Sequence, residues 1–303
     1  MNNQNISKPR SWLLAARPKT LLAAVVPVLV GGTLAYSDNI DKFSWTASLV
    51  AFFCSMCIQI GTNFTNDLFD FIKGADTDER VGPTRVLSAG LISKSEMKNA
   101  IIVVFGAAFF AGLYLVQIGG ISIFIIGILS IFSGIIYTAG PYPLAYNGLG
   151  DLFSFVFFGV VGTMGTYYVN IKEWSLHSFI ASIPVGALIT AILVVNNYRD
   201  IVQDAKAGKK TLAVKFGKSF TRMEYIALLL LAFFAPVYLV YHSHFSIWLL
   251  LPCLLLPLAL RMISMLFKFR NQALNSLLEL TAKFAALFGL LFSIGLVIGK
   301  ISR

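Results

Sequence analysis

Long apolar runs recur along the whole chain and are separated by short polar segments. A membrane-spanning helix needs roughly 20 mostly apolar residues. The pattern predicts nine such helices, near residues 20–36, 45–64, 98–117, 120–138, 150–169, 177–197, 223–241, 246–267 and 281–299. The link at 117–120 is so short that the third and fourth helices should be antiparallel neighbours. We expect an all-α integral membrane protein whose single domain spans residues 1–303.

Composition and charge support a membrane protein. Of the 303 residues, 57% are hydrophobic and 13% are charged, whereas soluble proteins carry about 25% charged residues. The net charge of +10 arises in short loops between apolar runs, where basic residues orient a membrane protein. We therefore expect a lipid bilayer, and no nucleic acid, as partner. Cys54, Cys57 and Cys253 have no Cys or His cluster beside them, so neither a zinc site nor a disulfide framework is predicted.

The placement of lysine and arginine predicts the orientation. If the N-terminus is cytoplasmic, the outer segments contain only Lys42, Lys172, Lys300 and Arg303. This asymmetry favours a cytoplasmic N-terminus and an outer C-terminus in the cell (inner or cytoplasmic) membrane. The ends of the second and sixth spans then both face the cytoplasm, where phosphorylated metabolites and magnesium are available.

Two polar stretches, 63–85 and 196–211, hold half of the 14 acidic residues. Each follows an apolar run, and acids are costly at such positions, so we interpret them as functional. Residues three and four apart share one face of a helix. This spacing groups Asn63 with Asp67 and Asp70, and Asn196 with Asp200 and Asp204. An even number of spans separates the two groups, so both lie on the same side of the membrane. We expect them to face each other across a central cavity, which requires this common polarity.

The chemistry of these stretches suits a diphosphate held through magnesium. Carboxylate and amide oxygens are hard ligands of the kind that Mg²⁺ prefers. We predict Asp67, Asp70, Asp200 and Asp204 as catalytic residues, with Asn63 and Asn196 near the metal. Arginine and lysine would complete the clamp on phosphate oxygens. The candidates beside the two stretches are Lys73, Arg80, Arg85, Lys209 and Lys210.

Departure of a diphosphate from an allylic substrate would leave a carbocation in the cavity. Such a cation is stabilised by aromatic ring faces. The candidates near the polar stretches are Phe64, Phe69, Phe71, Tyr137, Tyr142, Tyr146 and Tyr198.

Several segments together resemble one family. The motif N-D-x-x-D at 66–70 and the motif D-x-x-x-D at 200–204 are similar to the signatures of the intramembrane aromatic prenyltransferases, the UbiA superfamily. The segments 17–21, 82–85, 137–141 and 148–151 resemble the branch that prenylates 1,4-dihydroxy-2-naphthoate. The similarity extends along most of the chain.

The resemblance implies nine helices in a horseshoe around a cavity open laterally to lipid, with Mg²⁺ and a polyprenyl diphosphate. By motif position, Asn66, Asp70, Asp200 and Asp204 would be metal-site residues, with Arg80 and Lys210 near the diphosphate. Many relatives have a third acid where this chain has Gly74, and Asp76 could replace it.

In the naphthoate branch, the prenyl group replaces the ring carboxylate, CO₂ is lost, and the product is demethylmenaquinol, the precursor of menaquinone. Arg17, Lys19 or Arg199 could hold the acceptor carboxylate, and Tyr137 could contact the acceptor. Two alternatives remain open: a prenyltransferase acting on another aromatic acceptor such as 4-hydroxybenzoate, and a membrane transporter. The acids lie at helix ends instead of at mid-membrane, which favours the enzyme over the transporter.

Overall fold

The computed structural model describes residues 6–75 and 85–301, and every regular element in these ranges is a helix. The short elements η2, η4 and η5 are 3₁₀ helices, and η3 is a π-helix. The elements are α1 (Lys8–Ala16), α2 (Pro18–Asp38), α3 (Trp45–Ile72), α4 (Lys94–Ile136), η2 (Leu144–Tyr146), α5 (Gly150–Ser154), η3 (Phe155–Val161), α6 (Gly162–Ile171), α7 (Leu176–Lys206), α8 (Leu212–His242), η4 (Ile247–Leu255), α9 (Leu256–Lys268), η5 (Asn271–Ala273) and α10 (Leu274–Ile301). The all-helical prediction is confirmed.

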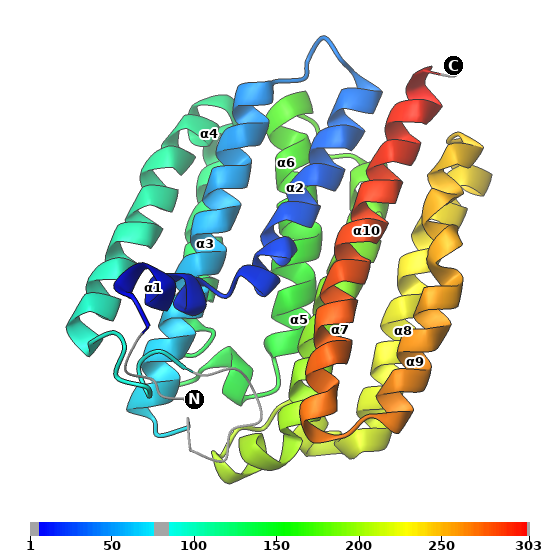
Figure 1. Ribbon diagram of the computed structural model, residues 1–303. Helices are drawn as coiled ribbons and strands as arrows, with labels where there is room; N and C mark the ends of the chain where they lie inside the picture. The colour runs from blue at the N-terminus through cyan, green and yellow to red at the C-terminus, as the bar shows by residue number, and fades with distance from the viewer. Residues whose placement is uncertain (1–5, 76–84, 302–303) are drawn as a thin grey trace.

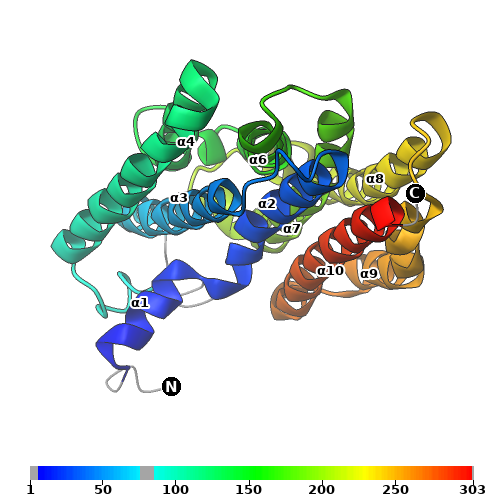
Figure 2. The ribbon, with the colours of Figure 1, turned by 90° about the horizontal axis from the view of Figure 1, so that it is seen from above.

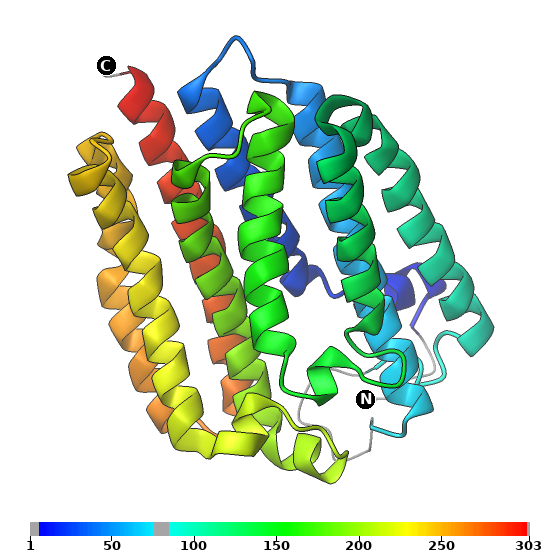
Figure 3. The same cartoon turned by 180° about the vertical axis from the view of Figure 1, so that it is seen from behind.

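Helix α4 consists of two membrane-spanning arms. Its 43 residues would extend about 65 Å as one straight helix, roughly twice the hydrocarbon thickness of a bilayer. Gly120 breaks it with a non-helical backbone (φ 66°, ψ −155°), and Figure 3 shows the two arms running antiparallel. The described chain contains eight long apolar helical segments, with α4 counted once. When the two arms of α4 are counted separately, the number of these segments becomes nine, which is the number of spans that the apolar pattern predicts.

Helices α3 and α7 continue well beyond their apolar runs. The predicted spans end near residues 64 and 197, whereas α3 ends at Ile72 and α7 at Lys206. The extra turns carry amide and carboxylate side chains that line an internal cavity, so the hydropathy falls although the helix continues. Both extensions lie at the same end of the bundle, the lower end in Figure 1.

The helices form a curved arrangement with packed cores on both sides of the cavity. Figure 2 shows α3 and α4 on one side, α8, α9 and α10 on the other, and α2, α6 and α7 between them. The largest hydrophobic core joins α2, α7, α8 and α10. Smaller cores join α3 to both arms of α4.

Glycine contacts hold the π-helix η3 against α7. A Cβ atom at Gly159 would lie 2.4 Å from the Cα atom of Gly186, and one at Gly186 would lie 2.8 Å from the Phe155 carbonyl oxygen. Only glycine permits this approach, as is common where membrane helices pack closely. The contact holds η3 against the first half of α7, and the preceding α5 reaches Asn197 near the polar end of that helix. π-helical turns occur frequently at functional sites.

Candidate active site

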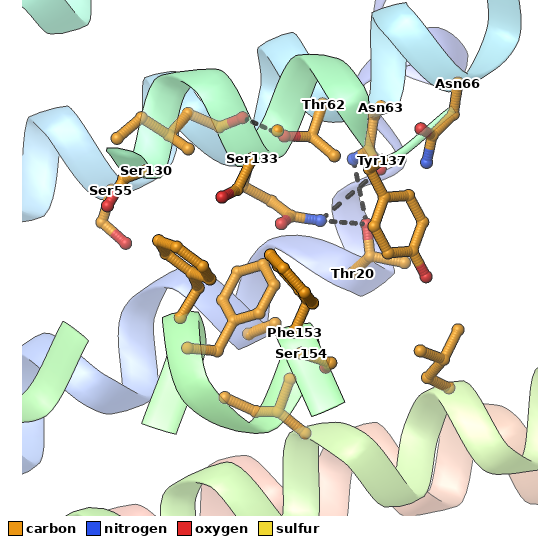
Figure 4. Close-up of a pocket in the computed structure, with 18 of the residues that line it drawn as sticks. Thr20, Ser55, Thr62, Asn63, Asn66, Ser130, Ser133, Tyr137, Phe153 and Ser154 are labelled. Atoms are coloured by element: carbon orange, nitrogen blue, oxygen red, sulfur yellow. Dashed lines mark hydrogen bonds between the residues drawn. The ribbon is translucent and has the colours of Figure 1, made fainter. Parts of the chain in front are cut away.

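A cavity of about 690 Å³ lies among α2, α3, α4, the continuous α5–η3–α6 helix and α7. One end contains the aspartates of α3 and α7, and the walls become apolar toward Leu115, Ile123 and Val169. Figure 4 shows its polar side chains facing the ring of Phe153 across the cavity. The cavity therefore combines a charged end with a long hydrophobic interior.

The first aspartate pair is buried and neutralised by an arginine. Asp67 and Asp70 lie in the last turns of α3, each 2% exposed. Arg85 contacts both: its Nη2 atom is 3.0 Å from Asp70 Oδ2, and its Nη1 atom is 3.6 Å from Asp67 Oδ1. Buried carboxylates require this kind of compensation. The first acidic stretch is thus an organised ionic cluster at the cavity wall.

The second stretch is organised by Arg199. Its guanidinium donates in bidentate fashion to Asp200, with Nε–Oδ1 and Nη2–Oδ2 distances of 2.7 and 2.6 Å. The same group donates to Asn196 Oδ1 and Asn275 Oδ1, both at 2.8 Å. Its donors are therefore engaged with protein oxygens, and the side chain fixes the orientation of Asp200.

Lys209 joins the two acidic stretches. Its Nζ atom lies 3.4 Å from Asp70 Oδ1 and 3.7 Å from Asp204 Oδ1. Gly208 has a left-handed backbone (φ 74°) after the end of α7, and the Lys209 amide donates to the Asp204 carbonyl oxygen at 2.8 Å. This turn folds Lys209 back over the cavity. The predicted convergence of the two distant stretches is confirmed.

Lys210 and Lys73 occupy different positions from Lys209. The Lys210 backbone amide donates to the Tyr146 carbonyl oxygen at 2.8 Å, while its side chain is exposed and is not part of the cavity wall. Lys73 Nζ donates to the Thr138 carbonyl oxygen at 2.8 Å and lies 4.3 Å from the centroid of the Tyr146 ring. Burial lowers the pKa of Lys73, and the Asp70 charge opposes this shift.

Tyr146 connects these basic residues to Asp70. Its hydroxyl donates to Asp70 Oδ1 at 2.8 Å, and Lys209 Nζ lies 4.9 Å from its ring centroid. The sequence analysis proposed this residue only as a carbocation partner. Its position shows a different set of contacts, in which two lysines approach the ring and the hydroxyl donates to an aspartate.

The three predicted asparagines all border the cavity, with different partners. Asn66 Oδ1 accepts a hydrogen bond from Thr138 Oγ1 at 2.7 Å. Asn63 Nδ2 donates to the Ala16 carbonyl oxygen at 2.9 Å and to Thr20 Oγ1 at 3.1 Å, as Figure 4 shows for Thr20. Asn63 therefore also anchors the junction of α1 and α2.

The donor set fits a metal whose coordination is completed by substrate. Within residues 6–75 and 85–301, no group of three or more His, Cys, Asp or Glu side chains is close enough to hold a metal by itself. The carboxylates instead form two pairs with Lys209 between Asp70 and Asp204. Mg²⁺ usually takes one or two carboxylates together with water and substrate phosphate. Asp76 and Arg80 lie outside the described residues.

The four candidates for the acceptor all border the cavity. Arg17 forms the turn between α1 and α2 with a left-handed backbone (φ 53°), and it borders the cavity together with Lys19 and Tyr137. Lys19 is largely exposed and pairs with Glu279 of α10. The Tyr137 hydroxyl approaches the start of α5, since a Cβ atom at Gly150 would lie 3.0 Å from it.

The surroundings of Tyr137 raise the pKa of its hydroxyl, which at an ordinary pKa of about 10 is already protonated at neutral pH. Burial raises the pKa of Tyr137, and the charges of Asp151, Asp70 and Asp204 raise it further, whereas Arg17 lowers it. The hydroxyl can therefore donate a hydrogen bond to a ligand at neutral pH.

The aromatic lining differs from the prediction. Of the seven predicted rings, only Tyr137 borders the cavity. Phe64 packs against Trp12, and Tyr198 accepts a hydrogen bond from Arg222. The rings that do border it are Phe109, Phe124, Phe153, Phe157 and Phe158. The sequence analysis missed them because they lie within apolar runs, where nothing separates a cavity-lining ring from a lipid-facing one.

The polar residues of the cavity wall that were also missed include Asp151, Asn197 and Gln203. Asp151 is buried, and Asn197 Nδ2 lies 3.5 Å from its Oδ1 atom. A signal was present for Asp151, because it is an acid that begins an otherwise apolar span.

Fold and cavity together define a multi-pass membrane protein with a buried carboxylate site for an amphiphilic ligand. The UbiA prenyltransferase family profile matches residues 24–295. The chain belongs to the UbiA prenyltransferase family.

Related proteins resemble the chain over nearly its full length. It is 36% identical to a 1,4-dihydroxy-2-naphthoate octaprenyltransferase of Haemophilus influenzae, covering 96% of this chain and 97% of that one. It is 34% identical to the protein of that name from Escherichia coli, covering 99% of each. A solved UbiA homolog from Archaeoglobus fulgidus bound to DMAPP and Mg²⁺ has a TM-score of 0.70 at 17% identity, covering 95% of this chain and 99% of that one.

Proposed function

We propose that the protein transfers a polyprenyl group from polyprenyl diphosphate to 1,4-dihydroxy-2-naphthoate, releasing CO₂ and diphosphate and forming demethylmenaquinol for menaquinone biosynthesis. The names of relatives at 34–36% identity over nearly the whole chain support this substrate pair. The observation that carries the proposal is the contact of Lys209 with Asp70 of α3 and Asp204 of α7, because it builds one anion-binding centre from both acidic stretches.

The diphosphate end of the cavity supplies both metal ligands and cations. Asp70, Asp200, Asp204 and Asn66 would hold Mg²⁺, with Asp67, Asn63 and Asn196 beside them. Asp76, outside the described residues, stays a further candidate. When bound, Mg²⁺ stabilises the charge that develops on the departing diphosphate oxygens. Arg85 and Lys209 already lie against the aspartates and can turn their donors to phosphate oxygens. Lys73 would be an outer cation of this clamp, and Arg80, which lies outside the described residues, is a further candidate. The exposed Lys210 side chain lies outside the cavity wall and is not assigned to the clamp.

The remaining cavity protects and orients the reacting carbon. Phe153 and Phe157 stack with ring centroids 5.7 Å apart on the cavity wall. Their faces stabilise an allylic cation, and the apolar walls accommodate the prenyl chain and exclude water that would capture the cation.

The acceptor would enter beside the α1–α2 turn. Arg17, Lys19 and Tyr137 border this region, and the guanidinium of Arg17 suits a carboxylate. Arg199 was also a candidate for the acceptor carboxylate, but its donors contact Asp200, Asn196 and Asn275. We therefore assign Arg199 to the positioning of Asp200.

The distribution of basic residues supports a cell (inner or cytoplasmic) membrane location with the acidic end of the cavity on the cytoplasmic side. That side is where a soluble naphthoate would be available.

Product identification tests the function. The purified full chain is incubated with Mg²⁺, a polyprenyl diphosphate, and either the naphthoate or 4-hydroxybenzoate, and products are identified by mass spectrometry. We expect the decarboxylated prenyl naphthalenediol. Prenylation of 4-hydroxybenzoate alone would reject the acceptor, and solute flux in vesicles without any prenylated product would support a transporter.

A further inference from the structure

Within the part of the chain that the structure describes, Asp151 is the one buried acid that forms no ion pair with a lysine or arginine. Five carboxylates are buried in the described part of the chain: Asp67, Asp70, Asp151, Asp200 and Asp204. Four of them have a lysine or arginine nitrogen within 4.0 Å. Asp151 has no such ion pair among the described residues. A buried carboxylate without a cation is costly, so its presence at a cavity wall calls for a functional reason.

The backbone fixes Asp151 at the cavity wall. Gly148 turns the chain with φ 82°, and α5 begins at Gly150, so Asp151 lies in its first turn. Asn197 of α7 provides a single long side-chain contact, 3.5 Å from Nδ2 to Oδ1. A carboxylate accepts about four hydrogen bonds. The Asp151 backbone supplies a further contact to this carboxylate, so about half of this capacity is available to a ligand in the cavity.

Asp151 lies beside the region assigned to the acceptor. Tyr137 and Gly150, whose close approach brings α4 and α5 together, both border the cavity. Figure 4 shows Tyr137 between Asn66 of α3 and Ser154 of α5. A planar ring held near Tyr137 would therefore have the diphosphate centre on one side and α5 on the other.

We infer that Asp151 accepts the proton of the acceptor hydroxyl that neighbours the attacked ring carbon; this inference rests on the proposed function. As the allylic carbon bonds to the ring carbon bearing the carboxylate, the hydroxyl oxygen shares its electrons with the ring. Its proton passes to Asp151, and the oxygen becomes a ketone. The bond to the carboxylate then breaks, CO₂ departs, and the electron pair restores the aromatic ring. The proton returns to the oxygen, so Asp151 ends unchanged.

The test is Asp151→Asn in the purified full chain, which removes the base and keeps the volume. General bases contribute about 10²–10⁴-fold to rates, so we expect kcat to fall at least about 100-fold. Binding of polyprenyl diphosphate with Mg²⁺, measured by calorimetry, should stay within about threefold, since the diphosphate ligands are untouched. Glu224→Gln is the matched control, because Glu224 is a partly buried acid of α8 that does not border the cavity.

A modified substrate tests the inference without altering the protein. The methyl ether of that hydroxyl has no proton to give, so the unmodified protein should prenylate it at least about 100-fold more slowly than the diol. An ether that reacts at the rate of the diol overturns the inference. So does an Asp151→Asn variant with unchanged kcat, or one that loses diphosphate binding as strongly as turnover. If the unmodified protein prenylates no aromatic acceptor, the proposed function itself fails.

Discussion

Replacing Lys209 by methionine removes the one cation that contacts both acidic helix ends in the described chain. The Lys209 side chain is 16% exposed, and its Nζ atom lies 3.4 Å from Asp70 and 3.7 Å from Asp204. Methionine keeps the length of the side chain and removes its charge. The substitution therefore isolates the electrostatic contribution of this residue to the diphosphate centre.

The distances set the expected size of the effect. Two unit charges 3.4 Å apart interact by about 1 kcal/mol in bulk water and by about 5 kcal/mol at an effective dielectric constant near 20. Lys209 is mostly buried, so an intermediate value of about 3 kcal/mol is reasonable for its contact with a diphosphate oxygen. This corresponds to a factor of roughly 10² in rate. Removing one donor that stabilises developing charge typically costs about 10²–10³-fold.

The neighbouring lysine provides the control. Lys210→Met removes the same charge from an exposed side chain outside the cavity wall, and we expect less than about a threefold change in kcat/KM. Rates are measured with both variants in the same detergent and at saturating acceptor, by quantifying the prenylated product. Equal losses in the two variants, or a fully active Lys209→Met variant, would refute the assignment of Lys209 to the diphosphate centre.

Three further predictions follow from the same site. Replacing Asp67, Asp70, Asp200 or Asp204 by alanine should lower turnover at least about 10³-fold in each case. Membrane insertion, assessed by fractionation, should be retained. Full activity of the Asp70, Asp200 or Asp204 variant would contradict the carboxylate clamp. EDTA should abolish turnover and Mg²⁺ should restore it, and turnover that persists in EDTA would exclude a dissociable metal. Arg199→Lys should lower kcat about 10–100-fold, because a lysine cannot reproduce the bidentate contact with Asp200. The KM for the acceptor should not rise. A selective rise in that KM would instead indicate that Arg199 binds the acceptor.

The membrane architecture was predictable because it depends on local properties. Apolar runs must satisfy their backbone groups within the bilayer, and a helix does this within one segment. The short link at 117–120 likewise required a reversal, which Gly120 provides through its left-handed backbone. The ends of α3 and α7 were underestimated because the turns that carry Asp70 and Asp204 are polar, although they face a cavity inside the protein.

The site was predictable only in part. Paired acids at helical spacing could be identified as one face of a helix from their sequence separation alone. The different positions of Lys209 and Lys210 could not be predicted, because the two lysines are adjacent in one motif. They point to different places because of the turn at Gly208 and the hydrogen bond from the Lys210 amide to Tyr146. The lining phenylalanines were equally inaccessible, since hydropathy does not show which face of a span borders a cavity.

The sequence by itself determined a helical membrane protein with two acidic helix ends on one side, since chain length, hydropathy and residue spacing act within single segments. Tertiary structure alone decided that Asp70 and Asp204 share Lys209 and that Arg199 orients Asp200. It also decided that Asp151 borders the same cavity with no ion pair to a described lysine or arginine. These contacts join residues far apart in the chain, and their distances depend on how the helices pack, above all where glycines such as Gly186 let neighbouring backbones approach.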